Sequence, residues 1–368
     1  MSIDNKVKKK LGFGCMRMHM KGDEVDYERF TQLVDTFLEN GFNYFDTAHG
    51  YLNGQSEVAI RKCLTSRHPR ESYVLTNKLS TLHFEKEEDI RPLFESQLEA
   101  CGVEYFDFYL MHAQNASRHK KYLACRAYEI AAELKAEGKI RHMGISFHDT
   151  AEVLDKILTD CPQIEVVQLQ LNYVDFEDAS VQSGKCYEVC RKHGKPVIVM
   201  EPVRGGNLVK LPEEAQKIFD DLKGGSNASY AIRFAAGFEN VMMVLSGMNE
   251  MEHMLDNISY MKDFQPLSAR EQEAVNEVCR IFRSKRLIPC TACRYCTDVC
   301  PTGIDIPLLF SCMNNKKLFN FSGTYYKIYT QNGRKASDCI KCGQCESICP
   351  QNLPIRSLLE DVAAEYDG

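Results

Sequence analysis

The sequence predicts an α/β protein in which a (β/α)₈ barrel precedes a small, mainly helical domain. Short apolar runs alternate with longer amphipathic runs eight times over about 250 residues, which is the rhythm of such a barrel. Cysteines then gather in two runs near the C-terminal end of the chain. At 368 residues, 44% of them hydrophobic, the chain is long enough for a barrel with an attached domain.

Eight runs have the composition of buried strands. They are residues 11–16, 43–48, 73–78, 106–112, 142–147, 166–172, 196–202 and 241–247. A doubly wound sheet shows a similar alternation, but its dinucleotide site usually opens with G-x-G-x-x-G after the first strand. Here the first strand carries only LGFG. The barrel is therefore the favoured fold.

Amphipathic runs between the strands predict helices that close on glycine. Examples are residues 26–41, 87–102 and 127–139. We expect the barrel to end with a helix over 251–264, and a helix over 268–285 to lead onward. The predicted domains are the barrel at 1–265, a connecting helix at 266–285 and a cysteine-rich domain at 286–368.

The two cysteine runs share one spacing, in which three Cys two residues apart precede a fourth that is followed by Pro. They are Cys290, Cys293, Cys296, Cys300 and Cys339, Cys342, Cys345, Cys349. Three such thiolates wrap three irons of one cubane, while the fourth Cys binds the other cluster. The spacing therefore predicts two 4Fe-4S clusters, with Cys349 joining the first three cysteines and Cys300 joining the second three.

Two zinc sites are the alternative for these runs, but zinc prefers isolated Cys pairs that close one tetrahedron. Residues 286–360 are similar to the helical ferredoxin modules that act as electron relays in larger redox enzymes, so we expect a ferredoxin-like domain. The remaining nine cysteines are expected to be buried or incidental thiols. They are Cys15, Cys63, Cys101, Cys125, Cys161, Cys186, Cys190, Cys279 and Cys312.

Catalytic groups of (β/α)₈ barrels lie at the C-terminal ends of the strands. The candidates there are Asp46, Tyr51, Lys78, His112, Ser146, Gln168, Glu201 and Ser246. Taken singly, each has an ordinary explanation as a turn, surface or rim residue. Four of them in register on three successive strand ends favour a shared catalytic role.

Several segments match the pattern of one family. They are NYFDTAHGY (43–51), TNK (76–78), LMH (110–112), GKIRHMGIS (138–146), VQLQLNY (167–173) and EPVRGG (201–206). Over residues 10–265 the chain resembles the aldo-keto reductase family. The resemblance implies that Asp46, Tyr51, Lys78 and His112 form the catalytic tetrad.

The resemblance implies that Tyr51 is the general acid of carbonyl reduction, with a nicotinamide supplying hydride; the reverse reaction is alcohol oxidation. A phenol has a reference pKa near 10, and we expect the Lys78 ammonium to favour its ionised form. Asp46 is expected to pair with Lys78. His112 is expected to hydrogen-bond the substrate carbonyl and orient it.

The family also implies where the nicotinamide cofactor binds, with the adenosine phosphate on the loop after the eighth strand, where a helix begins. The residues implied are Ser146, Gln168, Glu201, Ser246, Gly247, Met248, Asn249, His253 and Asn257. Members that prefer NADP place Lys and Arg in this loop, whereas this chain has Glu250, which would repel a 2′-phosphate. NADP and NAD both stay open as the cofactor.

The formal net charge of -6 and the pI near 6.0 argue against a nucleic-acid partner. No apolar stretch approaches the roughly 18 to 20 residues of a membrane span, and the first residues lack a hydrophobic signal region, so we expect a cytoplasmic protein. The expected partners are a small carbonyl or alcohol substrate and, as a candidate, an external ferredoxin or other redox protein.

The leading hypothesis is a nicotinamide-dependent oxidoreductase that interconverts a carbonyl and an alcohol and carries a two-cluster relay. One alternative is an electron-transfer protein whose barrel is a docking or sensing scaffold, which the intact tetrad disfavours. Another is proton-transfer or lyase chemistry in the barrel. A hydride carries two electrons, whereas a cluster passes one at a time, so direct exchange between them normally needs a mediator. Three roles of the clusters therefore stay open: they feed electrons to the barrel site, connect it to an external carrier, or brace the structure.

Overall fold

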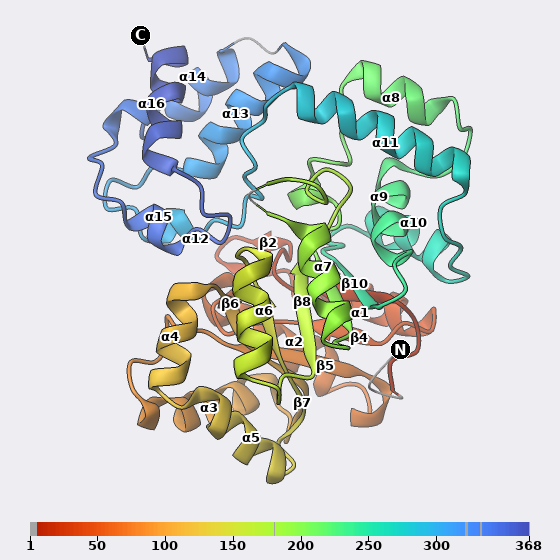
Figure 1. Cartoon of the computed structure of the whole chain (residues 1–368), viewed down its shortest axis with the longest axis vertical. Helices are drawn as coiled ribbons and strands as arrows, with labels where there is room; N and C mark the ends of the chain where they lie inside the picture. Colours follow the sequence, from red (N-terminus) through yellow and green to blue (C-terminus); the bar gives the residue numbers. More distant parts are fainter. Residues whose placement is uncertain (1–5, 180, 321–322, 332, 368) are drawn as a thin grey trace. The chain divides into compact units, whose positions relative to one another are not determined.

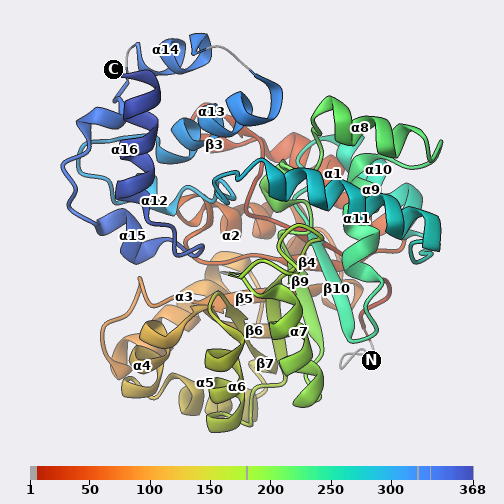
Figure 2. The same cartoon turned by 45° about the horizontal axis from the view of Figure 1, so that its top comes forward.

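The computed structural model describes residues 6–179, 181–320, 323–331 and 333–367 (Figures 1 and 2). The chain divides into two compact units. The barrel unit comprises Met1–Pro202 and Ser229–Leu267, and the cysteine unit comprises Val203–Ala228 and Ser268–Gly368. The assignment of residues 203–228 to the cysteine unit has no counterpart in the sequence pattern.

Parallel strands close the barrel in the order β1-β10-β9-β8-β7-β6-β5-β4. They are β1 (Leu11–Gly14), β4 (Tyr44–Asp46), β5 (Val74–Leu79), β6 (Phe106–Gln114), β7 (Ile140–Phe147), β8 (Val166–Gln170), β9 (Val197–Met200) and β10 (Val241–Ser246). The (β/α)₈ barrel is confirmed. A short hairpin, β2 (Met20–Lys21) and β3 (Glu24–Val25), was not predicted, because two residues are too few to show an alternating pattern.

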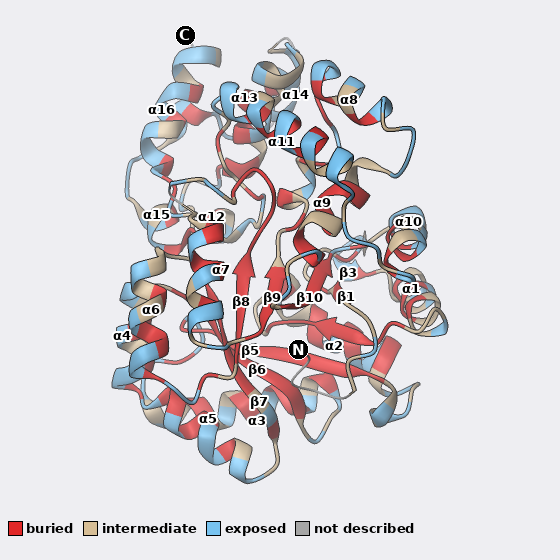
Figure 3. Ribbon diagram, turned by 45° about the vertical axis from the view of Figure 1, so that its right-hand side comes forward, coloured by how far each residue is buried: buried red, intermediate tan, exposed pale blue. Residues whose placement is uncertain are grey.

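Helices follow the strands of the barrel unit. They are α1 (Tyr27–Glu39), α2 (Gln55–Ile60), α3 (Ile90–Cys101), α4 (Ala116–Ala124), α5 (Ala127–Ala136), α6 (Ala151–Asp160), α7 (Ser183–Lys192), α9 (Asn227–Ala236) and α10 (Met251–Met261). Each turns buried residues toward the strands and exposed residues away from them (Figure 3). In α1 the Asp26 side chain caps the helix by accepting from the Arg29 N–H, and Phe30, Val34 and Phe37 are buried.

Aromatic and aliphatic side chains fill the barrel interior, among them Tyr44, Phe108 and Ile198. Gly144 on β7 leaves room for its neighbours, because an added Cβ would lie 2.6 Å from both the Leu110 and the Val166 side chains and from the Val166 carbonyl oxygen. Glycine is therefore needed here for close packing of adjacent strands.

Replacing Gly144 with Ala is expected to destabilise the barrel by about 1–3 kcal/mol, since the added methyl overpacks the interior. Thermal unfolding followed by circular dichroism measures the loss as a lower midpoint. Gly14→Ala on β1 is the matched control, because its Cβ would approach other atoms no closer than 3.6 Å. Equal midpoints for the two variants would contradict this packing argument.

The regular secondary structure in the described residues of the cysteine unit is all helical, with loops between the helices. Its helices are α8 (Glu213–Asp220), α11 (Ala269–Ser284), α12 (Tyr295–Asp298), α13 (Ile306–Phe319), α14 (Thr324–Thr330), α15 (Gln344–Ile348) and α16 (Ile355–Tyr366). α11 packs on α8, and Lys285 forms an ion pair with Glu214. A core that includes Phe310, Ile355 and Val362 joins α13 and α16. None of the helices in the described part of the chain is both long and apolar enough to cross a bilayer.

Candidate functional site

The four tetrad residues converge at the C-terminal end of the barrel strands. Asp46 ends β4, Lys78 lies in β5 and His112 in β6. The Lys78 Nζ donates to Asp46 Oδ1 at 2.5 Å and lies 3.3 Å from the Tyr51 hydroxyl. The ring centroids of Tyr51 and His112 are 5.9 Å apart. Lys78 has no exposed surface, so its charge acts inside the protein rather than in water.

A bulge in β6 sets the position of His112. The register between β6 and β7 shifts between Met111 and Gln114, and Ala113 adopts φ 52°. The Ala113 N–H donates to the Ser146 hydroxyl at 2.7 Å, which fixes this left-handed residue. Bulges beside active sites commonly re-aim a side chain. The Ser146 hydroxyl thus supports the histidine from the neighbouring strand.

An irregular turn sets the position of Tyr51. Tyr51 opens a 3₁₀ segment, Tyr51–Gly54, in which Leu52 and Asn53 have φ of 52° and 54°. Left-handed conformations at residues other than glycine cost free energy and cluster at functional sites. The turn leaves the tyrosine 9% exposed, with the Lys78 Nζ 4.9 Å from the centre of its ring.

Burial dominates the ionisation of three of these residues, Tyr51, Lys78 and His112. It raises the pKa of Tyr51 well above its usual value, reinforced by Asp46 and opposed by Arg17. The expectation that Lys78 would favour the phenolate is therefore outweighed in this structure, and the phenol retains its proton. Burial also lowers the pKa of Lys78, against the pull of Asp46, and holds the pKa of His112 well below its usual value. His112 is thus a neutral imidazole.

Glu57 on α2 anchors a second polar network that the sequence did not reveal. Its buried carboxylate accepts from the Asn77 amide at 2.8 Å and lies 2.8 Å from His49 Nδ1. The Gln97 amide in turn donates to the Lys78 carbonyl at 3.0 Å. This network holds the backbone on both sides of Lys78. The available signal was a carboxylate among the apolar residues of QSEVAI, directly after the tyrosine turn.

Glu57 is expected to control the titration of His49. The hydrogen bond to Glu57 raises the pKa of His49 above its usual value, although burial opposes the shift. Glu57→Gln should lower that pKa, because the half-buried ring then loses its anionic partner. Histidine NMR titrations measure the shift. Glu85→Gln, at an exposed carboxylate, is the control, and an unchanged His49 titration in Glu57→Gln would refute the coupling.

Three of the residues implied for the nicotinamide lie at strand ends near the tetrad. They are Ser146 in β7, Gln168 in β8 and Glu201 directly after β9. The Gln168 amide donates to Asp46 Oδ2 at 3.0 Å, so Asp46 bridges Gln168 and Lys78. Glu201 follows β9 with φ 56° and accepts from Arg17 at 3.3 Å. Arg17 was not singled out in the sequence, since one arginine in a loop gives no pattern.

The other implied cofactor residues lie after β10. The Asn257 amide donates to the Ser246 hydroxyl at 2.7 Å, and the Tyr260 hydroxyl donates to the Asn257 carbonyl oxygen. Met248 is fully buried, Gly247 follows the end of β10, Asn249 is half-buried and His253 is exposed on α10. The loop leads directly into α10, whose first N–H groups are not capped by the Glu250 side chain. This arrangement fits an anionic group of a dinucleotide.

The carboxylate in this loop has a cationic partner. Glu250, expected to repel a 2′-phosphate, forms an ion pair with Arg29 of α1. A guanidinium therefore stands beside the carboxylate and offsets part of its charge.

The two cysteine runs share their left-handed backbone positions. Ala292 and Arg294 flank Cys293 with φ of 52° and 69°, and Lys341 and Gly343 flank Cys342 with φ of 59° and 78°. Gly303 and Asn352, each three residues beyond the last cysteine of its run, also have positive φ. The chain thus forms one loop twice, even where arginine, lysine or asparagine must adopt the left-handed region.

The first predicted ligand set lines one cavity. Its walls include Cys290, Cys293, Cys296 and Cys349, closed by apolar residues of α13. The cysteine from the second run thus lines the same cavity as three from the first, and their binding of one cluster stays a prediction. These residues fit a cubane, in which each thiolate binds its own iron and apolar walls limit water.

Hydrogen-bond donors support Cys300, the cysteine that the spacing predicts for the other set. Burial opposes ionisation of Cys300, but hydrogen bonds from the Thr302 hydroxyl and from the backbone of Ile304, Thr302 and Gly303 outweigh it and lower its pKa. In the described residues, no three or more His, Cys, Asp or Glu side chains converge on a position for a single metal ion. The nine cysteines outside the runs are all buried, as expected.

Comparison with known proteins gives the family. The model of the aldo/keto reductase family matches residues 10–280, and that of the 4Fe-4S dicluster domain matches residues 289–353. The NADH-specific methylglyoxal reductase of Escherichia coli is 27% identical over 259 residues, covering 65% of this chain and 71% of that protein. An uncharacterised oxidoreductase of Schizosaccharomyces pombe is 24% identical, covering 70% and 82%.

Solved structures share the barrel fold. The aldo-keto reductase AKR11C1 of Bacillus halodurans, in its holo form, superposes with a TM-score of 0.60 at 23% identity, covering 74% of this chain and 92% of that one. An aldo-keto reductase of Klebsiella pneumoniae in complex with NADPH gives 0.60 at 20% identity, covering 74% and 95%. The chain belongs to the aldo/keto reductase family and carries a 4Fe-4S dicluster domain after its barrel.

Proposed function

We propose that this protein is a nicotinamide-dependent oxidoreductase that interconverts a carbonyl and an alcohol, with an attached two-cluster electron relay. The observation that carries the proposal is the buried Lys78 ammonium, which lies between the Asp46 carboxylate and the Tyr51 hydroxyl. Asp46, Tyr51, Lys78 and His112 are the proposed catalytic residues.

The tetrad performs general acid catalysis on a substrate carbonyl. His112, as a neutral imidazole, donates a hydrogen bond to the carbonyl oxygen and orients it. Tyr51 delivers its proton to that oxygen as negative charge develops, and Lys78 stabilises the resulting phenolate. Asp46 holds the ammonium in place through its 2.5 Å hydrogen bond. The bound nicotinamide supplies the hydride.

The cysteine unit is proposed to hold two 4Fe-4S clusters. Cys290, Cys293, Cys296 and Cys349 bind one, and Cys339, Cys342, Cys345 and Cys300 bind the other. We also propose that the barrel domain spans 1–265 and that residues 266–285 connect it to a ferredoxin-like domain at 286–368. The lining of the cysteine cavity and the match of the dicluster model support this assignment.

We propose NADH as the preferred cofactor. The family resemblance places a 2′-phosphate near Glu250, whose charge Arg29 offsets only in part, and the E. coli relative is named an NADH-specific enzyme. Glu250→Lys should raise kcat/KM with NADPH by roughly tenfold, the factor that about 1.4 kcal/mol supplies. The control is Glu252→Lys at an exposed position of α10, which makes the same change of charge. If wild type already favours NADPH tenfold, the proposed preference is wrong.

Anaerobic purification followed by a nicotinamide-coupled carbonyl screen tests the function. Methylglyoxal is the first probe, because the E. coli relative is named for its reduction. The expected result is carbonyl-dependent oxidation of NADH. Absence of turnover across aldehydes, ketones and the corresponding alcohols, in protein that retains its iron, would favour the scaffold hypothesis instead.

A further inference from the structure

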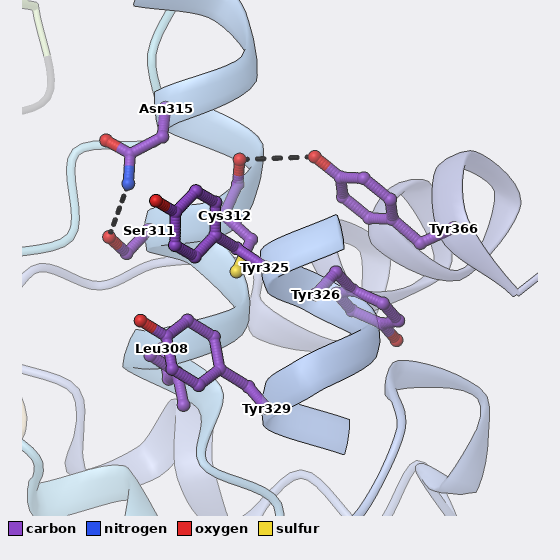
Figure 4. A pocket seen from close by; sticks show the side chains of 8 residues that line it. All are labelled: Leu308, Ser311, Cys312, Asn315, Tyr325, Tyr326, Tyr329 and Tyr366. Carbon is purple, nitrogen blue, oxygen red and sulfur yellow. Dashed lines mark hydrogen bonds between the residues drawn. The ribbon is translucent and has the colours of Figure 1, made fainter. Parts of the chain in front are cut away.

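A groove lined by tyrosines lies in the cysteine unit, outside the cysteine cavity. Leu308, Ser311 and Asn315 of α13 form one wall, and Tyr325 and Tyr329 of α14 form the other (Figure 4). We call these five residues the tyrosine groove; its volume is about 250 Å³. In Figure 4 the rings of Tyr325 and Tyr329 lie side by side on α14 and face α13.

Two further tyrosines form the fixed inner end of the groove. Tyr326 and Tyr366 stack with centroids 4.5 Å apart and an interplanar angle of 13°. The Tyr366 hydroxyl donates to the Cys312 carbonyl at 3.1 Å, and the Tyr326 hydroxyl donates to Asp367. Tyr326 is thereby fixed in the core, and Tyr366 is fixed against it. By contrast, Tyr325 and Tyr329 remain 52% and 46% exposed, next to Ile328 at 56%.

An exposed aromatic face of this kind is typical of an interface. Tyr325, Ile328 and Tyr329 follow the i, i+3, i+4 pattern, so they share one side of α14. Aromatic side chains are enriched at protein interfaces and often dominate their binding energy.

The segment that supplies both walls of the groove is basic, unlike the chain as a whole. Residues 306–337 contain no Asp or Glu and five basic residues, whereas the whole chain has a net charge of -6. The five are Lys316, Lys317, Lys327, Arg334 and Lys335. Lys316 pairs with Glu365 of α16, but no described carboxylate pairs with Lys327 or Arg334. The segment that carries the aromatic face therefore has a net positive charge, while the acidic Glu365 and Asp367 lie toward the inner end of the groove.

α13 connects this surface to the cysteine cavity. Its residues Ile306, Pro307 and Phe310 line the cavity that Cys290, Cys293, Cys296 and Cys349 share. Its other side, with Leu308, Ser311 and Asn315, lines the groove. A molecule resting in the groove is thus separated from the first cluster site by about one helix width, roughly 10–12 Å.

We propose that the tyrosine groove and the basic residues of 306–337 form a docking surface for a small acidic electron-carrier protein. The proposal rests on the relay function proposed above. In each encounter one electron leaves the carrier's iron-sulfur centre and enters the first cluster, so the carrier is oxidised by one electron and the cluster is reduced by one, with no proton moved. Basic rims steer acidic partners, and small aromatic contacts suit weak electron-transfer encounters.

Binding of an acidic bacterial ferredoxin to the anaerobically purified chain tests the proposal. Titration calorimetry at low salt gives the affinity, and carbodiimide cross-linking maps lysines that contact carboxylates. The test variant is Lys327→Glu with Arg334→Glu. The matched control is Lys120→Glu with Lys185→Glu, two exposed lysines of the barrel unit without ion pairs in the described structure. Both double variants lower the net charge by the same amount.

The expected result is binding weakened roughly tenfold or more in Lys327→Glu/Arg334→Glu and little changed in the control. Wild-type affinity should fall with salt, and cross-links should map to Lys327 or Lys335. Tyr325→Ser with Tyr329→Ser should weaken binding without removing the salt dependence. Equal affinities of the two charge variants, cross-links confined to the barrel unit, or binding of duplex DNA or anionic vesicles in place of ferredoxin would overturn the proposal.

Reduction with dithionite tests the clusters separately from the docking surface, because dithionite reduces clusters without binding to such a surface. If dithionite produces the spectrum of reduced clusters but the two charge variants bind ferredoxin equally, the docking surface is wrong and the relay stands. If the wild-type chain holds no iron-sulfur clusters, the relay is wrong and the docking proposal falls with it.

Discussion

Replacing Tyr51 with Phe is expected to lower kcat for carbonyl reduction by roughly 10²–10⁴-fold, the usual contribution of a general acid. The phenol is the only group in the tetrad that both keeps its proton when buried and lies within reach of a cation that can stabilise the resulting anion. Phenylalanine preserves the ring and its packing against His112. The change therefore removes the proton and little else.

Steady-state kinetics with a carbonyl and NADH measure this loss. Tyr73→Phe is the matched control, because Tyr73 is a buried tyrosine directly before β5 that takes no part in the tetrad. Cofactor affinity, measured by fluorescence titration, should stay near the wild-type value in Tyr51→Phe. Full turnover in Tyr51→Phe would rule out this general acid.

Lys78→Met tests whether the reaction passes through a Tyr51 phenolate, as carbonyl reduction by the tetrad does. It leaves the Asp46 carboxylate buried beside Gln168 without its cation, so both activity and stability should fall, the latter by about 3–5 kcal/mol. If Tyr51→Phe and Lys78→Met both retain nicotinamide-dependent turnover, the barrel performs a different reaction.

Replacing Cys293 with Ser is expected to remove one cluster, about four of eight irons per chain, and to destabilise the cysteine unit. Metal binding free energy is also folding free energy in such small units, because the ligands come together only in the folded chain. The helices α12 and α15 are short, so they have few contacts of their own to replace the cluster.

Iron analysis and EPR spectroscopy of the reduced protein measure the loss. Cys312→Ser is the control, since Cys312 is a buried thiol in the same unit that lies off the ligand spacing. It should keep its iron. Unchanged iron content and EPR spectra in Cys293→Ser would refute the ligand assignment.

Periodic features of the chain were readable from the sequence. The alternation of strands and helices, the strand ends that present Asp46, Lys78 and His112, and the cysteine spacing all repeat at fixed intervals. Each follows from local rules of burial or ligand geometry, which the order of residues records directly.

Features that depend on contacts across the fold were not readable. The bulge that re-aims His112 depends on the Ser146 hydroxyl one strand away, and the Glu250 charge is offset by Arg29 from another helix. The raised pKa of Tyr51 could not be predicted from the sequence for the same reason. A nearby cation was expected to favour the phenolate, but the extent of burial, a property of the whole barrel, decides the balance.

The most direct test of the central claim follows deuterium from labelled NADH into the alcohol product. Direct hydride transfer at the tetrad predicts that the label appears on the carbinol carbon, in wild type and also in Cys293→Ser protein that still turns over. Delivery of electrons through the clusters, with protons taken from water, would give an unlabelled product. That result would contradict a reductase site that works by direct hydride transfer.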